Sequence, residues 1–434
     1  MKSQSKILLI FSTVILCFLF LLIHLLNVKP IITYSIIYIS SSIIFVFISW
    51  LIIKNEIPFS YVAGLVAVGI LLRISFVSIN PIGSDDYYRY LWDGKVQSAG
   101  INPYLYSSND PSLQNLHSET IPKFVNNPDM KTIYFPLSQW LFYAGYSLSG
   151  EAVWGYKLLL LIFELITLIA LFLLLRIIKI PDKNILLYAL CPLPIIQFSL
   201  DAHLDGFGLP LLILALFFHL DNKKILALIF LGLSFSIKPV GLLFLPILFF
   251  HEKRLPERIK VVFIPAAAFS VQFLPYILTS NPFEAFFIYA KHWTFNGIVF
   301  NIIDSFIQNN QTARIICGIL LVICLLPFIF NKMDLLHKYY YSVLLLLIFS
   351  PVVHPWYIAW LAILLPIIPR WSGIFYVGLS SLTVFTVLSY QLNGLWKEYP
   401  IVLMLEYIPV VIILIYELSK EKNVFTYGRK KTVS

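Results

Sequence analysis

Long apolar runs recur from one end of the chain to the other, and they limit what it can fold into. Hydrophobic residues make up 59% of the 434 residues and charged residues only 12%, whereas soluble domains carry about 25% charged residues. Mean hydropathy is +0.85. This composition excludes a soluble globular protein, a disordered chain and a disulfide scaffold. It predicts one integral membrane domain over residues 1–434, an all-α, polytopic bundle of transmembrane helices.

The lengths of these runs set the expected number of membrane spans. Each crossing helix needs about 20 apolar residues, and because several runs are shorter than that we expect about 12–14 spans. The candidate runs are residues 7–26, 31–53, 58–79, 157–178, 184–200, 206–220, 225–237, 239–250, 259–278, 313–330, 339–351, 356–368, 371–390 and 400–418.

Basic residues predict the orientation of the bundle. The formal net charge is +9, which in a membrane protein marks cytoplasmic loops rather than nucleic-acid binding. With a cytoplasmic N-terminus most Lys and Arg residues lie inside, and the C-terminal Arg429–Lys431 cluster becomes a cytoplasmic anchor. Lys253 also lies inside if the run 225–250 breaks near Lys238-Pro239. We therefore expect both termini on the cytoplasmic side of a bacterial plasma membrane.

Polar clusters that interrupt the apolar runs all fall on the outer side in this orientation. Short or proline-broken spans beside polar residues point to a site in the membrane, and charged groups near hydrocarbon are costly enough to suggest function. The clusters are Ser84-Asp85-Asp86, Asp201 to Gly206, Lys238-Pro239, Lys291-His292-Trp293 and His354-Pro355-Trp356-Tyr357. The sequence thus predicts a functional site on the outer face.

Two outer loops are longer than the others, residues 80–156 and residues 279–312. Within the first loop, residues 84–96 predict a helix with Ser84 as its N-cap and acidic residues in its first turn. An apolar face carries Tyr88, Leu91, Trp92 and Val96 at helical spacing. An amphipathic helix rich in Tyr and Trp is typical of a membrane interface, so we expect interfacial helices in this loop.

The ordered motifs of the outer face resemble those of the GT-C superfamily of polytopic glycosyltransferases, above all the polyprenol-phosphate-mannose-dependent mannosyltransferases. The matching pieces are Asp85-Asp86-Tyr87, Gly100 to Tyr104, Tyr134-Phe135-Pro136, Cys191-Pro192-Leu193-Pro194 through Asp205, Ile237-Lys238-Pro239 and His354 to Tyr357. The resemblance begins near residue 58, so the first two spans look like an addition to the usual core. It implies a GT-C fold, a polyprenyl-phosphate sugar donor, a lipid or glycan acceptor, no nucleic-acid partner, and a role in cell-envelope glycan synthesis.

Sugar transfer from a lipid phosphate makes particular demands on side chains. The acceptor hydroxyl needs a carboxylate base, and the departing phosphate needs cations rather than a proton. A glycoside hydrolase instead needs two carboxylates, one of them an acid. The outer face offers an early acidic pair and several basic side chains. The predicted activity is inverting transfer of a hexose, mannose by resemblance, with an Asp as general base.

The resemblance implies that Asp85 or Asp86 is the base, and Asp86 is favoured because it shares a helix face with Arg89. Donor-phosphate binding is assigned to Lys238, His354, Lys291 and His292. Acceptor or sugar binding is assigned to Arg89, Asp201, His203, Asp205, Trp293, Trp356 and Tyr357. No metal ligand and no cofactor is assigned, although a divalent cation, Mg²⁺ or Mn²⁺, at Asp85 and Asp86 stays an alternative.

Plain structural roles compete with these assignments. Asp86 also suits a helix N-terminus, Lys238 also suits snorkelling to the interface, and His354 also suits an aromatic belt. Arg73 and Glu164 lie inside spans, where they are expected to pair with each other or with backbone.

Other protein classes share some of these features. A transporter or flippase of lipid-linked sugars also has broken helices, but no motif repeats between the two halves of this chain. A lipid-linked oligosaccharide ligase would rely on Arg and His in a late outer loop. A structural assembly subunit would have little use for polar residues gathered on one face.

Overall fold

The computed structural model describes residues 3–25 and 30–421. These residues form helices joined by turns and by one long, mostly irregular stretch over residues 99–135. In the described ranges the only strand-like pairing is the isolated bridge of Phe295 and Asn296 with Val352. The predicted all-α class is confirmed. The predicted anchor Arg429–Lys431 lies outside the described residues.

Six helical segments of the described chain are long and apolar enough to cross a bilayer, and a seventh span arises if a pair bent by 43° is one crossing. The six include α1 (Ser3–Leu25), α2 (Pro30–Lys54), α6 (Trp154–Ile177), α15 (Asn310–Phe330) and α20 (Pro400–Lys420). The sixth joins α18 (Trp371–Leu379), η6 (Ser380–Thr383) and α19 (Val384–Asn393). The bent pair is η2 (Asp182–Ile185) with α7 (Leu186–Ala189), then α8 (Pro192–Pro194) with the single π-turn η3 (Ile195–Leu200). The protein is therefore a multi-pass membrane protein.

Shorter helices fill most of the other predicted runs. They are α3 (Phe59–Ser75), α9 (Asp205–Leu220), α10 (Lys224–Phe235), η4 (Pro239–Leu243), α11 (Phe244–His251), α12 (Leu255–Ser270), η5 (Val271–Phe273), α16 (Leu335–Phe349) and α17 (Pro355–Ala362). The expected break between residues 225 and 250 lies at Lys238, which precedes the proline that opens η4. Proline lacks a backbone N–H and tends to start a helix rather than continue one.

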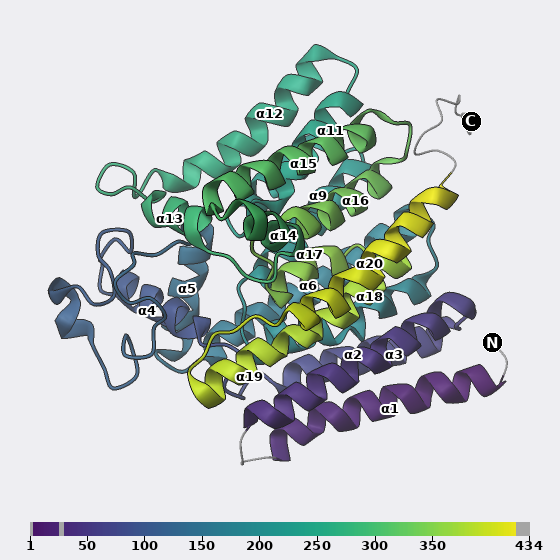
Figure 1. Cartoon of the computed structure of the whole chain (residues 1–434), viewed down its shortest axis with the longest axis horizontal. Helices are drawn as coiled ribbons and strands as arrows, with labels where there is room; N and C mark the ends of the chain where they lie inside the picture. The colour runs from purple at the N-terminus through teal and green to yellow at the C-terminus, as the bar shows by residue number, and fades with distance from the viewer. Residues whose placement is uncertain (1–2, 26–29, 422–434) are drawn as a thin grey trace.

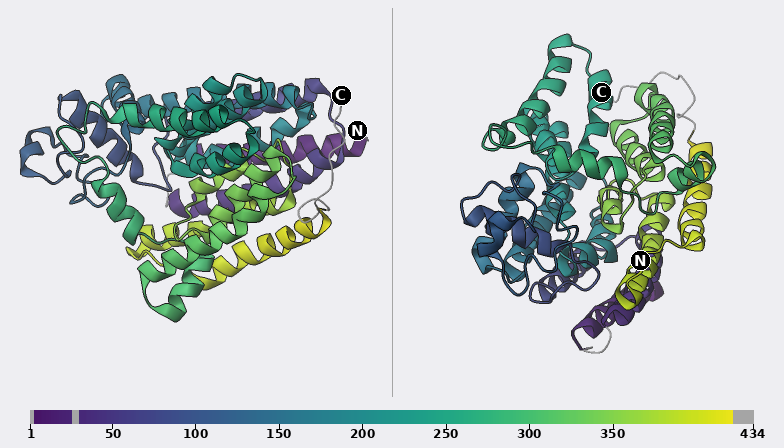
Figure 2. Two further views of the ribbon diagram at one scale, coloured as in Figure 1. Left: turned by 90° about the horizontal axis from the view of Figure 1, so that it is seen from above. Right: turned by 60° about the vertical axis from the view of Figure 1, so that its left-hand side comes forward.

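Most helices of the two outer loops lie at one end of the bundle (Figures 1 and 2). These are α4 (Asp86–Ser98), η1 (Pro111–Leu116), α5 (Pro136–Ser149) and α13 (Glu284–His292). Helix α14 (Ile298–Ile307) follows α13 and lies nearer the middle of Figure 1. Helix α1 begins, and helix α20 ends, at the opposite end in Figure 1. The two ends expected to face opposite sides of the membrane are thus the two ends of the bundle.

Helix α4 differs in two ways from the expectation. It begins at Asp86 with Asp85 as its N-cap residue, while Ser84 Oγ accepts a 3.2 Å hydrogen bond from the Asp86 N–H. The face expected at the membrane interface is instead inside the loop region, where Trp92 is 2% exposed. The loop after α4 covers this face, because the Trp92 ring contacts that of His117, with centroids 5.5 Å apart, and the Tyr88 ring contacts that of Phe124 at 5.3 Å. Helix α5 packs beside Gly94, which allows close approach to the Phe142 backbone. The tyrosines and tryptophan of α4 therefore make a protein core.

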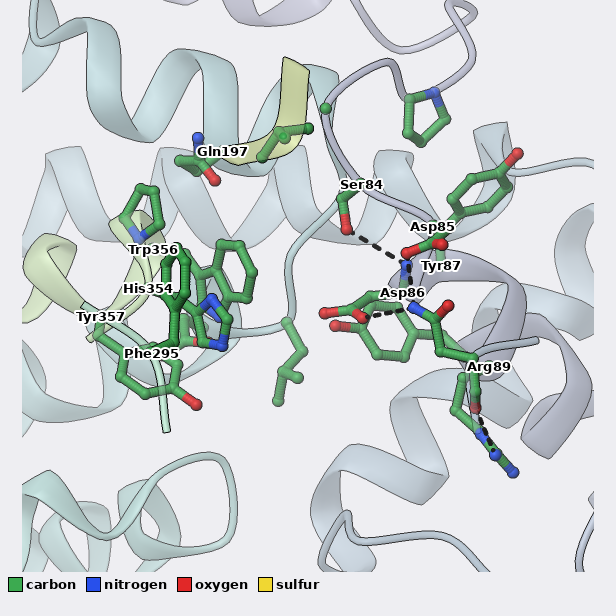
Figure 3. Close-up of a pocket in the computed structure, with 18 of the residues that line it drawn as sticks. Ser84, Asp85, Asp86, Tyr87, Arg89, Gln197, Phe295, His354, Trp356 and Tyr357 are labelled. Carbon is green, nitrogen blue, oxygen red and sulfur yellow. Dashed lines mark hydrogen bonds between the residues drawn. The ribbon is translucent and has the colours of Figure 1, made fainter. Parts of the chain in front are cut away.

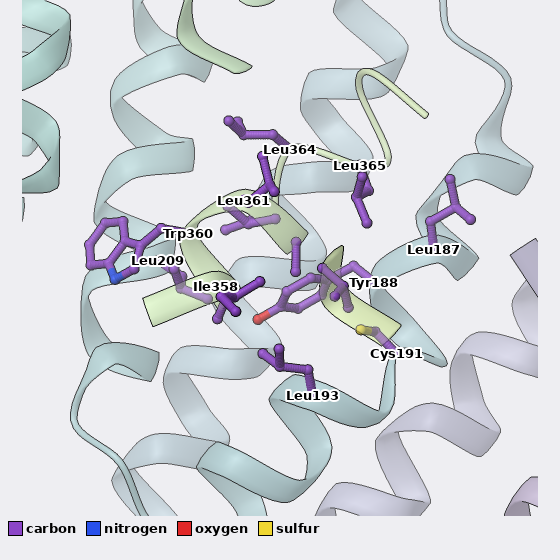
Figure 4. Packing of buried hydrophobic residues seen from close by; sticks show 14 of the residues in the cluster. Leu187, Tyr188, Cys191, Leu193, Leu209, Ile358, Trp360, Leu361, Leu364 and Leu365 are labelled. Atoms are coloured by element: carbon purple, nitrogen blue, oxygen red, sulfur yellow. The ribbon is translucent and has the colours of Figure 1, made fainter. Parts of the chain in front are cut away.

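Short, broken helices occupy the centre of the bundle. Every residue from 183 to 213 and from 358 to 368 is buried, and Figure 4 shows Tyr188 and Cys191 packed among leucines of both segments. Irregular backbone is tolerated at membrane depth when protein rather than lipid surrounds it. These two segments lead directly to the polar residues Asp201 to Asp205 and to His354, so the rigid centre of the bundle positions both groups.

A buried ion pair ties α3 to α6. Arg73 Nε donates a 2.9 Å hydrogen bond to Glu164 Oε2, and neither side chain is exposed. Arg73 also donates to the backbone carbonyls of Gly69 and Ala189, while Tyr188 donates to Glu164. The expectation that Arg73 and Glu164 pair is confirmed, and the pair has a structural role.

Candidate active site

One cavity of about 850 Å³ opens at the outer-loop end of the bundle. Its walls come from the N-terminus of α4, from the break before η4, from the start of α17 and from α13, all distant in sequence. Figure 3 shows Asp86 on one side of this space and His354, Trp356 and Tyr357 on the other. The acidic pair and several basic residues therefore converge in one cavity.

Two anchors hold the acidic pair in place. Asn126 donates a 2.5 Å hydrogen bond to Asp85 and a longer one, 3.4 Å, to Asp86. Asp201 accepts hydrogen bonds from the backbone N–H groups of Ile82 and Gly83, at 3.1 and 2.9 Å, just before the pair. Asp201 is 1% exposed and does not line the cavity. Its assignment to acceptor binding is replaced by a role in anchoring this turn.

The two neighbouring carboxyl groups have opposite pKa shifts. Burial and the adjacent Asp86 charge raise the pKa of Asp85. Burial alone would raise the pKa of Asp86 too, but the adjacent His203 and the amide of Asn126 hold that pKa below its usual value. Asp86 is therefore ionised at neutral pH and points into the cavity, which suits a proton acceptor.

Lys238 supplies a positive charge to the opposite wall. Its Nζ lies 3.3 Å from Asp205 Oδ1 and 2.8 Å from the centre of the Tyr357 ring. Asp205 also accepts a 2.8 Å hydrogen bond from Trp360 Nε1, which fixes its position. Burial lowers the pKa of Lys238 to about 8, while Asp205 opposes that shift. Lys238 is therefore held inward by Asp205 and Tyr357 rather than snorkelling to the interface.

Stacked rings surround His354. It lies parallel to Trp356, with centroids 4.3 Å apart, and Phe295 stacks on its other side at 4.6 Å. Burial lowers the pKa of His354 to about 3, so the ring is neutral at neutral pH. It can therefore donate a hydrogen bond to a phosphate oxygen but brings no charge, unlike the cation that the sequence suggests.

The second outer loop reaches this stack through a short backbone pairing. Phe295 donates to the carbonyl of Pro351 at 3.0 Å, and its own carbonyl accepts from Val353 at 2.7 Å. Asn296, the next residue, is held by Glu406 of α20 through a 2.9 Å hydrogen bond. These contacts bring residues more than fifty positions apart beside His354.

Two regions of the chain match families of known proteins. Residues 17–252 match the family described as alpha-(1->6)-mannopyranosyltransferase, N-terminal domain. The chain belongs to this family. Residues 293–418 match the family described as MptB C-terminal domain. The protein is accordingly a glycosyltransferase, and the expected mannosyltransferase kinship is confirmed.

A solved structure also aligns with much of the chain. The crystal structure of ArnT from Cupriavidus metallidurans in the apo state aligns with a TM-score of 0.46 and 15% identity, covering 84% of this chain and 73% of that one. No curated protein matches.

The assigned residues of this mannosyltransferase-family protein fall into two groups. Those that line the cavity are Asp85, Asp86, Arg89, Asp205, Lys238, Trp293, His354, Trp356 and Tyr357. Lys291 and His292 do not: they end α13 with exposed side chains outside the cavity, so their assignment to the donor phosphate is withdrawn. His203 lies behind the wall, 1% exposed, and does not contact the cavity space.

Arg89 lines the cavity, but its guanidinium group donates hydrogen bonds to the backbone of the large loop and not into the cavity. Its Nη2 donates to the backbone carbonyls of Asn126 and Asn127, at 2.9 and 3.0 Å. The turn that carries Asn126 is thereby held against the acidic pair. Neither Asn126 nor Tyr34, which donates to Asp201, stands out in the sequence, because each contacts its partner only through the folded chain.

No group of three or more His, Cys, Asp or Glu side chains suited to a metal ion occurs within residues 3–25 and 30–421. The spacing of Asp201, His203 and Asp205 does not gather their side chains, since Asp201 holds the turn before α4 and Asp205 holds Lys238. Asp85 and Asp86 share one amide donor, Asn126. The described carboxylates therefore have protein partners of their own.

Proposed function

We propose that this glycosyltransferase moves mannose from a polyprenyl-phosphate donor to an acceptor hydroxyl, with inversion at the anomeric carbon. The observation that carries the proposal is that one cavity is lined by both an ionised carboxylate, Asp86, and a partly buried cation, Lys238. Membership of a mannopyranosyltransferase family supports the sugar. Donor, acceptor and stereochemistry are proposals from the site's chemistry.

The reaction we propose is a single displacement. The acceptor oxygen forms a bond to the anomeric carbon while the bond from that carbon to the donor phosphate oxygen breaks. Asp86 takes the proton of the acceptor hydroxyl, and the bonding electrons leave with the phosphate. Attack on the face opposite the leaving phosphate inverts the configuration.

The departing phosphate gains negative charge, and the opposite wall is suited to receive it. Lys238 supplies a cation close to the cavity, and neutral His354 supplies an N–H donor. Such donors act strongly where water is excluded, because the local dielectric is low. Trp356 and Tyr357 offer ring faces on which a sugar can stack.

Hydrolysis by two flanking carboxyl groups fits this cavity less well. Hydrolases place an acid and a second carboxylate on opposite sides of the scissile bond. Here Asp85 and Asp86 are consecutive residues on one wall, tied to the same amide of Asn126. A lysine stands opposite them, which suits a phosphate leaving group.

A reconstituted transfer assay tests the proposal. The purified protein in liposomes receives radiolabelled polyprenyl-phosphate mannose and an alkyl α-mannoside as acceptor. We expect labelled mannoside from this donor, none from GDP-mannose, and none with D86N. Movement of labelled lipid across the bilayer without product would identify a flippase, and absence of both turnover and transport would refute both readings.

The site is expected to face outward from a bacterial plasma membrane, with cytoplasmic termini and a cell-envelope glycan or lipid as acceptor. Short basic loops opposite the catalytic end support this orientation. Labelling of single-cysteine variants in intact cells tests it: a cysteine at Lys253 should be protected from an impermeant reagent, and a cysteine at Lys123 in the large loop should react.

A further inference from the structure

His203 lies directly behind Asp86 and does not line the cavity. Its ring is 1% exposed and stacks on Trp356 with centroids 3.5 Å apart. Its backbone N–H donates a 2.9 Å hydrogen bond to the carbonyl of Gln197, within the buried centre of the bundle. The ring is thus held rigidly between the bundle core and the cavity wall.

Both ring nitrogens of His203 lack a hydrogen-bond partner among the described residues. A buried polar atom without a partner costs free energy, so such an atom in a native protein calls for an explanation. The nearest carboxylate oxygen is Asp86 Oδ2, 3.6 Å from His203 Nδ1. That distance is slightly longer than a hydrogen bond. When no substrate is bound, the hydrogen bonds between catalytic groups are often long, and they shorten when substrate binds.

We propose that His203 is a positioning residue for Asp86, and that its Nδ1–H donates to Asp86 Oδ2 and aims the other oxygen at the acceptor hydroxyl. This inference rests on the proposed function, in which Asp86 is the base. It gives His203 a role different from the sugar contact expected from the sequence.

The charged surroundings of His203 favour this arrangement. Asp85 and Asp86 interact with it from the N-terminus of α4, Asp201 from the segment that also carries His203, and His354 from the loop before α17. Asp201 is already satisfied by Tyr34 and by two backbone N–H groups. Asp86 is the carboxylate within reach of Nδ1, and a hydrogen bond to an ionised carboxylate favours the ionised form.

Three substitutions separate the hydrogen bond from the packing. His203→Phe keeps a ring against Trp356 but removes both nitrogens. His203→Asn places an amide N–H near the position of Nδ1, whereas His203→Gln places it near that of Nε2. The measurement is the pH profile of kcat/KM for the acceptor in the liposome assay, with size-exclusion elution and donor affinity recorded for each variant.

We expect H203F to shift the acidic limb of this profile upward by about one pH unit, because Asp86 loses a donor that favours its charged form. H203N should keep the limb close to that of the wild type, and H203Q should behave like H203F. An unshifted limb in H203F, or rescue by H203Q and not by H203N, would overturn the proposal. If H203F does not fold, the comparison of H203N with H203Q decides alone.

The two proposals fail in different ways. If the proposed function is wrong, the wild-type protein makes no mannoside from the lipid donor, whatever residue 203 is. If only the inference about His203 is wrong, the wild-type protein is active and D86N is inactive, while the acidic limb is the same with and without the imidazole.

Discussion

Tyr34 of α2 donates a 2.6 Å hydrogen bond to Asp201, whose other carboxylate oxygen accepts from the backbone just before the acidic pair. One carboxylate thus joins the second helix, the centre of the bundle and the turn that carries Asp85 and Asp86. The first two helices look like an addition in the sequence, yet α2 supports the site directly.

Removing this anchor should misplace Asp86 without removing any group that contacts substrate. We expect D201A to lower kcat by about 10–100-fold, since a misplacement near 1 Å can cost that much, while donor affinity changes little. D201N is the matched control, because its amide oxygen still accepts from the N–H groups of Ile82 and Gly83. Equal activity of D201A and the wild type in the liposome assay would show that the anchor does not position the site.

Substitution of the two neighbouring aspartates should lower kcat to very different extents. General-base catalysis contributes roughly 10²–10⁴-fold, so D86N should lose at least about 100-fold in kcat with donor binding retained. D85N should keep most activity, because the raised pKa of Asp85 and its contact with Asn126 suit a supporting role. Single-turnover rates with bound donor measure the chemical step. A larger loss of kcat in D85N than in D86N would identify Asp85 as the base.

Lys238 should determine the KM for the polyprenyl-phosphate donor. We expect K238M to raise the KM for the polyprenyl-phosphate donor by roughly tenfold or more, since a charge-assisted hydrogen bond contributes about 1.5–3 kcal/mol. K238R keeps the charge and should retain part of the affinity. A KM for the alkyl mannoside that rises while the donor KM stays constant would place Lys238 at the acceptor instead.

Donor binding should also weaken at alkaline pH. Burial lowers the pKa of Lys238 to about 8, so the cation is present below that pH and is lost as the pH rises through it. The KM for donor measured from pH 6 to pH 10 should therefore climb above about pH 8 in the wild type. In K238M the same measurement should be flat over this range, and a parallel climb in both proteins would exclude Lys238 as the titrating group.

The buried pair of Arg73 and Glu164 should matter for stability rather than catalysis. R73M leaves Glu164 charged and unpaired inside the protein, which we expect to lower the free energy of unfolding by about 3–5 kcal/mol. R73M/E164M should recover much of that loss, because it removes both charges. Unfolding in detergent micelles measures both variants. A double variant no more stable than R73M would point to the hydrogen bonds from Arg73 to backbone as the main contribution.

Apolar runs predicted the helices well because burial in lipid demands both length and hydrophobicity. The break at Lys238 was predictable from the proline that follows it, and the convergence of Asp86, Lys238 and His354 followed from placing every break on one face. Helix α14 was not predicted: at 10 residues it falls below the length that marks a span.

Errors arose where tertiary packing decides which way a side chain faces. Lys291 and His292 follow Tyr289 on one short helix, yet Tyr289 lines the cavity and the two basic residues face outward. Trp92 could face either lipid or protein, and the loop that carries His117 buries it inside the protein. The direction in which these side chains face depends on neighbours far away in the chain. The spacing of apolar residues along a helix carries no information about those neighbours.

The most direct test of the central claim is a structure with a donor analogue whose anomeric carbon is joined to phosphorus by a carbon atom. The account predicts the phosphonate against Lys238 and His354, with the anomeric carbon turned toward Asp86 and the mannose ring beside Trp356. An analogue whose phosphonate binds outside this cavity, or whose anomeric carbon faces away from Asp86, would contradict it.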